Sequence, residues 1–361
     1  MNDRLGRFGK RELTAVTTLC TLLLGCFSTD EASQFQNGNM LHYATAIALL
    51  LSLGLLELGL YALKRAHADG LGEWIARLPK WIAAALSLLL SGVLVLSAVL
   101  PEVRFLRAMT DFIYIDAAPV SIAVYLLPCL AVLTMLGMET LSRTGRVLLP
   151  ITLLAAIIGL ASDVPLYRLY RLYPLFTDVE SLLRQSAGAL LRFVPIVLLL
   201  LTVARGAQGL DFVRSAGRTG LLLGGAITLL AELALGLSYH YTELQSLTAP
   251  LYRLMVEIDT DNAAIRLDRV VLFAWTMAGQ FAAACSVYGA SLLLVQANGI
   301  GDVRPIALLL SAVTVTMALV LREADAMGSA ILSLLHRYGW IVATVPTLLL
   351  FLTARRIPCE N

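Results

Sequence analysis

The chain contains little charge and few aromatic residues for its length. Of its 361 residues, 14% are charged and 7% are aromatic, whereas 58% are hydrophobic. So small a polar fraction cannot coat a water-soluble globule of this size, which excludes an ordinary soluble enzyme or binding domain. A mean hydropathy of +0.80 indicates that apolar segments fill most of the chain. We therefore expect an integral membrane protein whose solvent is the lipid bilayer.

Residues suited to metal, redox or covalent chemistry are also scarce. The four histidines and five cysteines are scattered, with no CxxC pair and no metal-ligand spacing. The chain has no Gly-x-Ser-x-Gly elbow and no phosphate-binding loop, so no enzyme, cofactor or metal is predicted. An acidic stretch lacks the glycine that a calcium loop requires after its third ligand. Its members are Glu257, Asp259, Asp261 and Asp268.

Apolar runs long enough to cross a bilayer recur along the whole chain. A hydrocarbon core of about 30 Å requires roughly 20 apolar residues in a helix, and free backbone groups have no partners in lipid. The fold class predicted is therefore an all-α polytopic membrane protein of about ten transmembrane helices. The expected spans are 12–28, 40–63, 81–100, 115–138, 146–162, 184–204, 217–238, 269–297, 303–321 and 334–354.

Lys and Arg are distributed unevenly between the two sides of these spans. The segments on the side of the N-terminus hold more of them than the opposite segments, and the first opposite loop, 29–39, has none. Such residues are retained on the cytoplasmic side, so both termini are predicted to be cytoplasmic. The net charge of +2 is spread over the membrane flanks, and no patch indicates binding to nucleic acid.

The first span allows a second interpretation. A basic start, an apolar run and Leu23-Leu24-Gly25-Cys26 resemble a lipoprotein signal, in which Cys26 would become the lipidated first residue. The nine further spans favour a first membrane helix instead.

Ten spans without a long polar linker suggest one domain, 1–361, built from two five-helix repeats. Repeat one would cover about 12–162 and repeat two about 184–354, in the inverted arrangement that places a binding site at the membrane midplane. Helices 1 and 6 would then be broken and face each other. Possible breakers and pocket residues are Leu24, Gly25 and Cys26 in helix 1, and Arg192, Phe193 and Pro195 in helix 6.

Ionisable residues inside apolar spans are costly and need a partner, water or a function. Arg192 and Glu232 lie at similar depth in helices 6 and 7, which predicts an ion pair, a gate or a clamp for a ligand carboxylate. Glu57 lies near Lys64 and Arg65, where a solvated role or proton coupling is possible. Helices 3 and 8 would form pocket walls, with Trp275 as a candidate contact.

The segment before helix 6 interleaves tyrosines with arginines. Tyr167, Tyr170 and Tyr173 are spaced by three, with Arg168 and Arg171 between them. This spacing places the rings on one side of a helical turn. Aromatic anchoring at the lipid headgroups is the expected role, and gathering of a ligand is the alternative.

Several segments, in order along the chain, resemble one known family. They are Gly137-Met138-Glu139-Thr140-Leu141-Ser142-Arg143 followed by Leu148-Leu149-Pro150, then Tyr173-Pro174-Leu175, Ala249-Pro250-Leu251-Tyr252, and Arg266-Leu267-Asp268-Arg269 with Trp275. Together with Leu63-Lys64-Arg65 at the end of helix 2, they are similar to the GerAB-type B subunit of nutrient germinant receptors. This subunit belongs to the amino acid, polyamine and organocation transporters and acts in bacterial spores.

The resemblance implies a leucine-transporter-like inverted repeat and a pocket for an amino acid or similar nutrient. It also implies A-type and C-type partner subunits and a place in the spore inner membrane or the bacterial cell membrane. One departure is that helix 6 lacks the acid that family members often carry near Arg192. A proton- or sodium-coupled amino-acid permease, or a membrane scaffold with an inactive pocket, remain alternatives.

Overall fold

The computed structural model describes residues 8–27, 39–110, 117–176, 178–207, 209–244 and 267–323, and residues 330, 334, 338–342, 344 and 348 near the C-terminus. Side chains are described for all of these except 267–270 and 272. The described residues form helices and connecting turns without any strand. The predicted all-α class is therefore confirmed.

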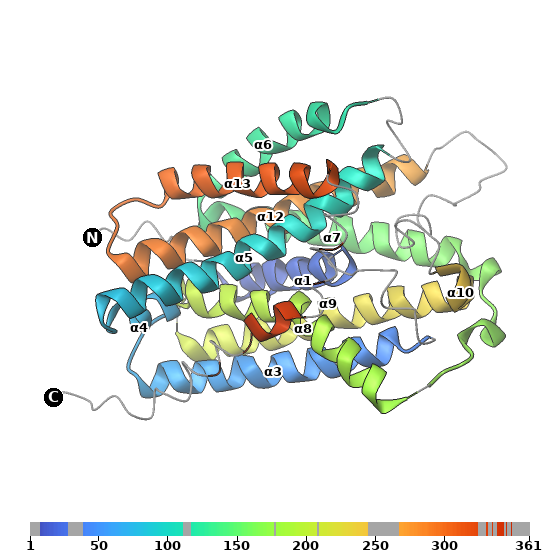
Figure 1. Cartoon of the computed structure of the whole chain (residues 1–361), viewed down its shortest axis with the longest axis horizontal. Helices are drawn as coiled ribbons and strands as arrows, with labels where there is room; N and C mark the ends of the chain where they lie inside the picture. The colour runs from blue at the N-terminus through green and yellow to red at the C-terminus, as the bar shows by residue number, and fades with distance from the viewer. Residues whose placement is uncertain are drawn as a thin grey trace.

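The long helices follow one another with short connections. They are α1 (Lys10–Phe27), α3 (Leu41–Arg65), α5 (Lys80–Ala108), α6 (Pro119–Leu136), α7 (Met138–Ser162), α8 (Val179–Val203), α9 (Leu210–Ser238), α12 (Leu267–Asn298) and α13 (Arg304–Glu323). Two short helices, α4 (Leu71–Ala76) and α10 (Tyr241–Leu244), lie at opposite ends of the bundle (Figure 1). Three 3-10 turns complete the described structure: η2 (Val164–Leu166), η3 (Leu169–Leu172) and η4 (Ala204–Gly206).

Eight helices among the described residues are long and apolar enough to cross a membrane. They correspond to predicted spans two to nine. Helix α1 matches the first predicted span but is not among the eight, because its 18 residues begin with Lys10, Arg11 and Glu12. The last predicted span lies mostly outside the described residues, and those described within it are helical.

Several helices extend beyond the predicted spans. Helix α5 continues eight residues past the expected end at Leu100, because Val103 and Leu106 are buried and Pro101 does not stop it. Arg104 and Arg107, expected in an outer segment, therefore lie on a helix. Helix α9 begins at Leu210, seven residues before the expected start, and so includes Arg214 as well as Arg218.

The expected connection between spans four and five is also helical. Only Gly137, with a φ of 85°, separates α6 from α7. This left-handed conformation is readily adopted by glycine, which explains the glycine that begins the Gly-x-Glu-x-x-x-Arg segment. Glu139 and Arg143 then form an ion pair across one turn of α7. The segments 249–252 and 257–261 lie outside the described residues.

The helices pack as two groups. The α1 group contains α1, α3, α8 and α9, in which α1 packs on α9 and α3 packs on α8. The α5 group contains α5, α6, α12 and α13, in which α5 packs on α12 and α6 on α13. Helix α7 contacts α1 and α12 and so joins the groups. Figure 1 shows α6 and α13 at one side of the bundle and α3 at the opposite side.

Glycines on α9 bring it very close to α1. A Cβ atom built on Gly220 would lie 2.4 Å from the Cβ of Thr17, and one on Gly224 would lie 2.6 Å from the carbonyl oxygen of Thr18. Helices in lipid associate by close packing of small residues because lipid is as apolar as their side chains. In the lipoprotein interpretation, cleavage before Cys26 would remove the preceding residues of α1. In the structure these residues form a helix that packs tightly on α9.

Helix 6 is not broken where the sequence suggested. Pro195 removes one backbone donor to the carbonyl of Leu191, yet α8 continues as an α-helix from Val179 to Val203. The predicted interruption at Arg192–Pro195 is therefore wrong, because surrounding buried side chains hold the helix on both sides of the proline. Helix α1 likewise runs without interruption through Leu24, Gly25 and Cys26 to Phe27, so the break predicted there is not found in the described residues; residues 28–38 lie outside the described part.

The tyrosine segment is fixed to the end of α9 by its arginines. Arg171 donates a hydrogen bond from its side chain to the carbonyl of Ser238, and the amide of Arg168 donates to the carbonyl of Leu237 at 2.9 Å. Cations stabilise the carbonyl-rich end of a helix. Tyr167 donates to the carbonyl of Leu160, whereas Tyr170 and Tyr173 are exposed. Exposed rings at this position suit the expected headgroup contact.

Candidate functional site

The centre of the α1 group holds a buried ion pair. Arg192 on α8 donates from Nη1 to Oε1 of Glu232 on α9 at 2.7 Å, and both side chains are 1% exposed. Thr45 on α3 donates to the same Oε1 at 2.9 Å and lies 3.2 Å from Arg192 Nη1. The structure thus brings together the two residues that the sequence placed at one depth. A third helix, α3, supplies a hydroxyl that sequence depth alone did not indicate.

Helix α1 reaches this cluster through its last turn. The carbonyl of Gly25 lies 3.4 Å from Arg192 Nη1 and accepts a hydrogen bond from it. A Cβ on Gly25 would lie 2.7 Å from Oγ1 of Thr228, so only glycine allows α1 this close to α9. Cys26 forms a hydrogen bond with Thr228 and lies near the charges of Glu232 and Arg192. Gly25, Cys26 and Arg192 therefore belong to one site.

The ion pair leaves two polar atoms without a partner. Arg192 Nε and Glu232 Oε2 are buried and have no hydrogen bond within the described part of the chain. An unpaired buried polar atom costs about 1–3 kcal/mol, and more when it belongs to a charged group. The cluster therefore presents one unsatisfied donor and one unsatisfied acceptor on opposite charges.

The other predicted pocket residues are buried around this cluster or beside it. Leu24, Phe193 and Pro195 lie in the hydrophobic interior and offer no polar side-chain atom. Trp275 on α12 packs edge-on against Phe27, with ring centroids 5.4 Å apart. Its indole Nε1 is buried and has no partner among the described residues. The contact places Trp275 next to the last turn of α1.

Glu57 lies in a different environment from the one the sequence suggested. Its carboxylate pairs with Arg214 at 3.1 Å and with Arg218, both on α9, instead of with Lys64 or Arg65. The earlier start of α9 places Arg214 alongside α3, in addition to Arg218. All three side chains are about one third to one half exposed. Glu57 therefore belongs to a partly exposed ion-pair cluster between α3 and α9.

A second buried carboxylate, Glu102, was missed by sequence reasoning. It lies on the extension of α5, is 3% exposed, and accepts a hydrogen bond at 2.7 Å from Gln280 on α12. Among the described residues it forms no ion pair. The apolar side chains of Val99, Val103 and Leu106 would have indicated that the helix continues past Pro101.

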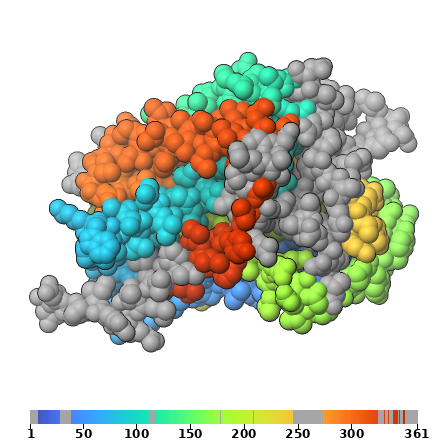
Figure 2. All heavy atoms as spheres, in the orientation of Figure 1, coloured from blue at the N-terminus to red at the C-terminus, as the bar shows by residue number. Residues whose placement is uncertain are grey.

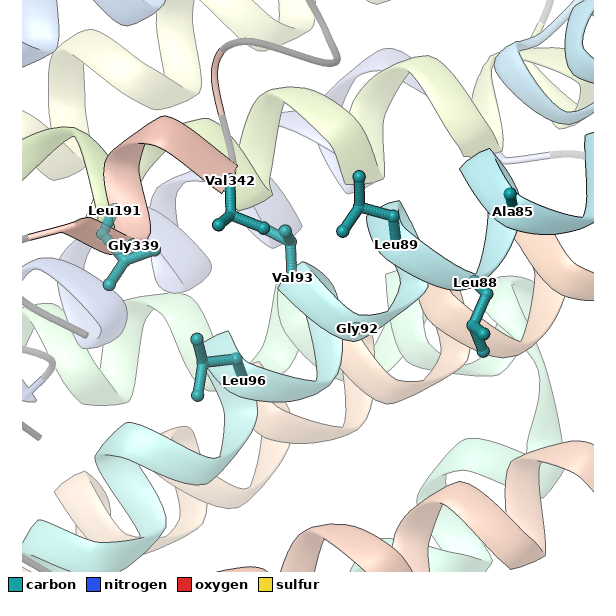
Figure 3. A pocket seen from close by; sticks show the side chains of 9 residues that line it. All are labelled: Ala85, Leu88, Leu89, Gly92, Val93, Leu96, Leu191, Gly339 and Val342. Atoms are coloured by element: carbon teal, nitrogen blue, oxygen red, sulfur yellow. The ribbon is translucent and has the colours of Figure 1, made fainter. Parts of the chain in front are cut away.

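The cavity that the structure describes is apolar and lies away from these groups. It has a volume of about 470 Å³ and is lined by α5, by Leu191 of α8, and by Gly339 and Val342 near the C-terminus (Figure 3). In Figure 2 the described part of the C-terminal segment, in red, lies between α5 and α8. The α5 lining consists of Ala85, Leu88, Leu89, Gly92, Val93 and Leu96. Such a lining has no group that could recognise a charged or polar ligand.

No cluster of three or more His, Cys, Asp or Glu side chains suited to a metal ion occurs in the described residues. The Arg192 cluster itself consists of a guanidinium, a carboxylate and a hydroxyl, groups that form hydrogen bonds and ion pairs.

Solved structures with a similar fold are membrane transporters. One is described as the substrate-bound outward-open state of a Na⁺-coupled sialic acid symporter; it is 12% identical, with a TM-score of 0.66 over 98% of this chain and 90% of that chain. Another is a manganese transporter of Eremococcus coleocola in complex with an aromatic bis-isothiourea substituted compound, 14% identical with a TM-score of 0.63 over 95% and 76%. A mutant of that transporter is 13% identical with a TM-score of 0.65. The chain therefore shares the leucine-transporter fold.

The sequence comparisons identify a family for this chain but no individual relative. No curated protein matches this chain. The family described as spore germination protein matches residues 47–327, which include most of α3 and every described helix from α4 to α13. The resemblance noted from short segments is thereby confirmed over most of the chain. This integral membrane protein belongs to the spore germination protein family.

Proposed function

We propose that this chain is the transporter-like membrane subunit of a nutrient germinant receptor, and that it binds an amino acid or a similar zwitterion. The observation that carries the proposal is the Arg192–Glu232 pair with its two unsatisfied atoms. Arg192 Nε can donate to a ligand carboxylate, and Glu232 Oε2 can accept from a ligand ammonium group. One small molecule that carries both groups would satisfy both atoms.

The surrounding residues suit such a ligand. Gly25 brings the end of α1 against the pair, and Trp275 with Phe27 provides an aromatic wall beside it. The cluster is closed, because Arg192 and Glu232 are almost fully buried. A ligand must therefore bind to a conformation in which α1 or α8 has moved from α9. Binding shifts the population of that conformation only by its difference in affinity for the two states.

The receptor role follows from this shift. Movement of α1 and α8 would pass to A-type and C-type partner subunits in the spore inner membrane and so lead to ion release. Both termini are placed on the cytoplasmic side, in line with the distribution of Lys and Arg. The support for this role is membership of the spore germination protein family.

The proposal includes two repeats, about 12–162 and 184–354. If the two repeats have equivalent structures, α1 corresponds to α8 and α3 corresponds to α9. A contact of α1 with α9 should then be matched by a contact of α8 with α3. Both contacts occur. Likewise, contact of α13 with α5 is matched by contact of α12 with α6. These matched contacts support the division into two repeats. In the proposed division, Arg192 lies on α8, the helix of repeat two that corresponds to α1.

A germination assay tests the proposal. Spores that lack this chain, and spores that carry Arg192→Lys, are exposed to a panel of amino acids, and loss of refractility is followed. We expect the deletion to abolish the response to at least one amino acid and Arg192→Lys to weaken it, since lysine cannot pair two groups through a planar fork. Tyr125→Phe, at an exposed position on α6, is the matched control. An unchanged response of the deletion strain to every nutrient would overturn the receptor role.

An amino-acid permease driven by protons or sodium is the second candidate. It is favoured by the transporter structures that share the fold. Reconstitution of the purified chain in vesicles distinguishes the two. Accumulation of labelled amino acid against its gradient, without other subunits, would establish a permease. Binding without accumulation favours the receptor, and an absence of both would favour a scaffold whose pocket is inactive.

A further inference from the structure

The α5 group contains a carboxylate that no charged group among the described residues compensates. Glu102 is buried between α5 and α12, and the hydrogen bond that it forms in the described part of the chain comes from the neutral amide of Gln280. An ionised carboxylate buried with a single amide partner is costly by several kcal/mol. By contrast, the buried Glu232 accepts hydrogen bonds from the guanidinium of Arg192 and the hydroxyl of Thr45.

The unsatisfied atoms of this pair show what is missing. Glu102 Oε2 and Gln280 Oε1 are both buried, and neither has a partner within the described residues. Both are acceptors, so a further acceptor cannot satisfy them. A proton on Oε2 would convert this atom from an acceptor to a donor. The acid could then donate a hydrogen bond to an acceptor such as the amide oxygen, while Oε1 still accepts from the Gln280 amide.

We infer that Glu102 is a proton-binding site of this membrane protein, with Gln280 as the residue that positions and stabilises the protonated acid. A proton from water forms the O–H bond on Oε2, and no other bond breaks. The inference rests on the α5–α12 contact alone and does not depend on the proposed nutrient site. It assigns to Glu102 the coupling role that the sequence left open for Glu57.

The groups that face Glu102 leave it without a positive partner. On α6 the neighbouring titratable group is the Cys129 thiol, and on α13 Arg322 donates to Thr110, which lies just past the end of α5. Helices α1 and α8 of the α1 group also contact α5, and Arg192 on α8 is bound to Glu232. The remaining charged groups on α5 and α4 are Lys80, Arg104, Arg107, Glu73 and Arg77, and none forms an ion pair with Glu102 in the described part of the chain.

Infrared spectroscopy of the purified full-length chain in lipid nanodiscs tests the inference directly. A protonated carboxylic acid has a carbonyl stretch that a carboxylate lacks. We expect this band near neutral pH, with the area of one carboxyl per chain lost in Glu102→Gln. Glu57→Gln, which removes an exposed and ion-paired carboxylate, should leave the band unchanged. Gln280→Leu should shift its frequency, because the hydrogen bonds to the acid are removed.

Two results would overturn the proton site. One is an identical spectrum in wild type and Glu102→Gln from about pH 5 to about pH 8, which would mean an ionised Glu102. The other is loss of the band on addition of Na⁺ or K⁺ at constant pH, which would make the two oxygens a metal-cation site. Should Glu102→Gln fail to fold, the frequency shift in Gln280→Leu still assigns the band.

Discussion

The α1 group and the α5 group each bury a glutamate, but they compensate its charge differently. In the α1 group, Glu232 meets Arg192 and Thr45 on two neighbouring helices. In the α5 group, the partner of Glu102 among the described residues is the neutral amide of Gln280. The first arrangement keeps charge of both signs inside the bundle and is the site proposed for a zwitterion. The second has no compensating charge in the described part of the chain and is the site proposed for a proton.

Substitution of each glutamate by glutamine should therefore change the stability of the folded protein by very different amounts. Glu232→Gln leaves the Arg192 guanidinium buried without a counter-charge, which costs about 3–5 kcal/mol. Glu102→Gln keeps the shape of the neutral acid and still pairs with Gln280, so its cost should stay within about 1 kcal/mol. Unfolding midpoints of the purified proteins in detergent, measured by intrinsic fluorescence, check both values. Equal losses at the two sites would remove the distinction between them.

A double substitution sharpens the first half of this comparison. Arg192→Met combined with Glu232→Met removes both charges and should recover much of the stability that either single change loses, because no uncompensated charge remains. Ligand response should stay lost in the double variant. Recovery of stability without recovery of germination or binding would separate the structural role of the pair from its role in recognition.

Packing between helices provides the next contrast. Gly220→Ala places a methyl group against Thr17 in the α1–α9 contact, where the gap is 2.4 Å, and should destabilise by about 1–3 kcal/mol. Gly279→Ala on α12 meets nothing within 4 Å and should stabilise by about 0.5–1 kcal/mol through helix propensity. Thermal unfolding of both variants in the same detergent gives the comparison. A neutral Gly220→Ala would show that α1 can move from α9 at little cost.

The sequence predicted the fold because the signal for it is long and repeated. Apolar runs of about 20 residues determined eight helices, and charge inside such runs identified Arg192 and Glu232 at one depth. Depth along a helix follows from the rise per residue, so a pair on adjacent helices can be anticipated. The contact with Thr45 could not be anticipated, because threonines are common in membrane helices and the rotation of a helix about its axis is set by packing.

The failures have a common physical cause. Glu102 was overlooked, and Glu57 was paired with the wrong residues, because helices α5 and α9 extend beyond their most apolar stretches. Charged residues lower the hydropathy of a segment even when they lie on a buried helix. The break expected at Pro195 failed for a related reason, since tertiary packing keeps a helix continuous where local chemistry disfavours it. The errors at Glu102 and at Pro195, next to Arg192, fall at sites that carry buried polar groups.

An exposed ion-pair cluster at the edge of the α1 group should contribute far less than its buried pair. Glu57→Gln removes the partner of Arg214 and Arg218, all of them partly exposed. Pairs of this kind contribute about 0.2–1 kcal/mol, and the contribution falls as salt screens the charges. The difference between the unfolding midpoints of wild type and Glu57→Gln should be smaller at high salt than at low salt. A loss as large as that of Glu232→Gln would contradict the difference assigned to burial.

The smallest effect is expected at the start of α8, outside both buried sites. The side chain of Asp178 accepts a hydrogen bond from the amide of Ser181, which lowers the pKa of this carboxyl below its usual value. A lowered pKa means that the stabilisation is present above the usual value near 4 and is lost as the pH falls through the folded-state value. Asp178→Asn keeps the helix cap without the titration. Its unfolding midpoint should therefore fall less steeply than that of wild type between about pH 5 and about pH 2.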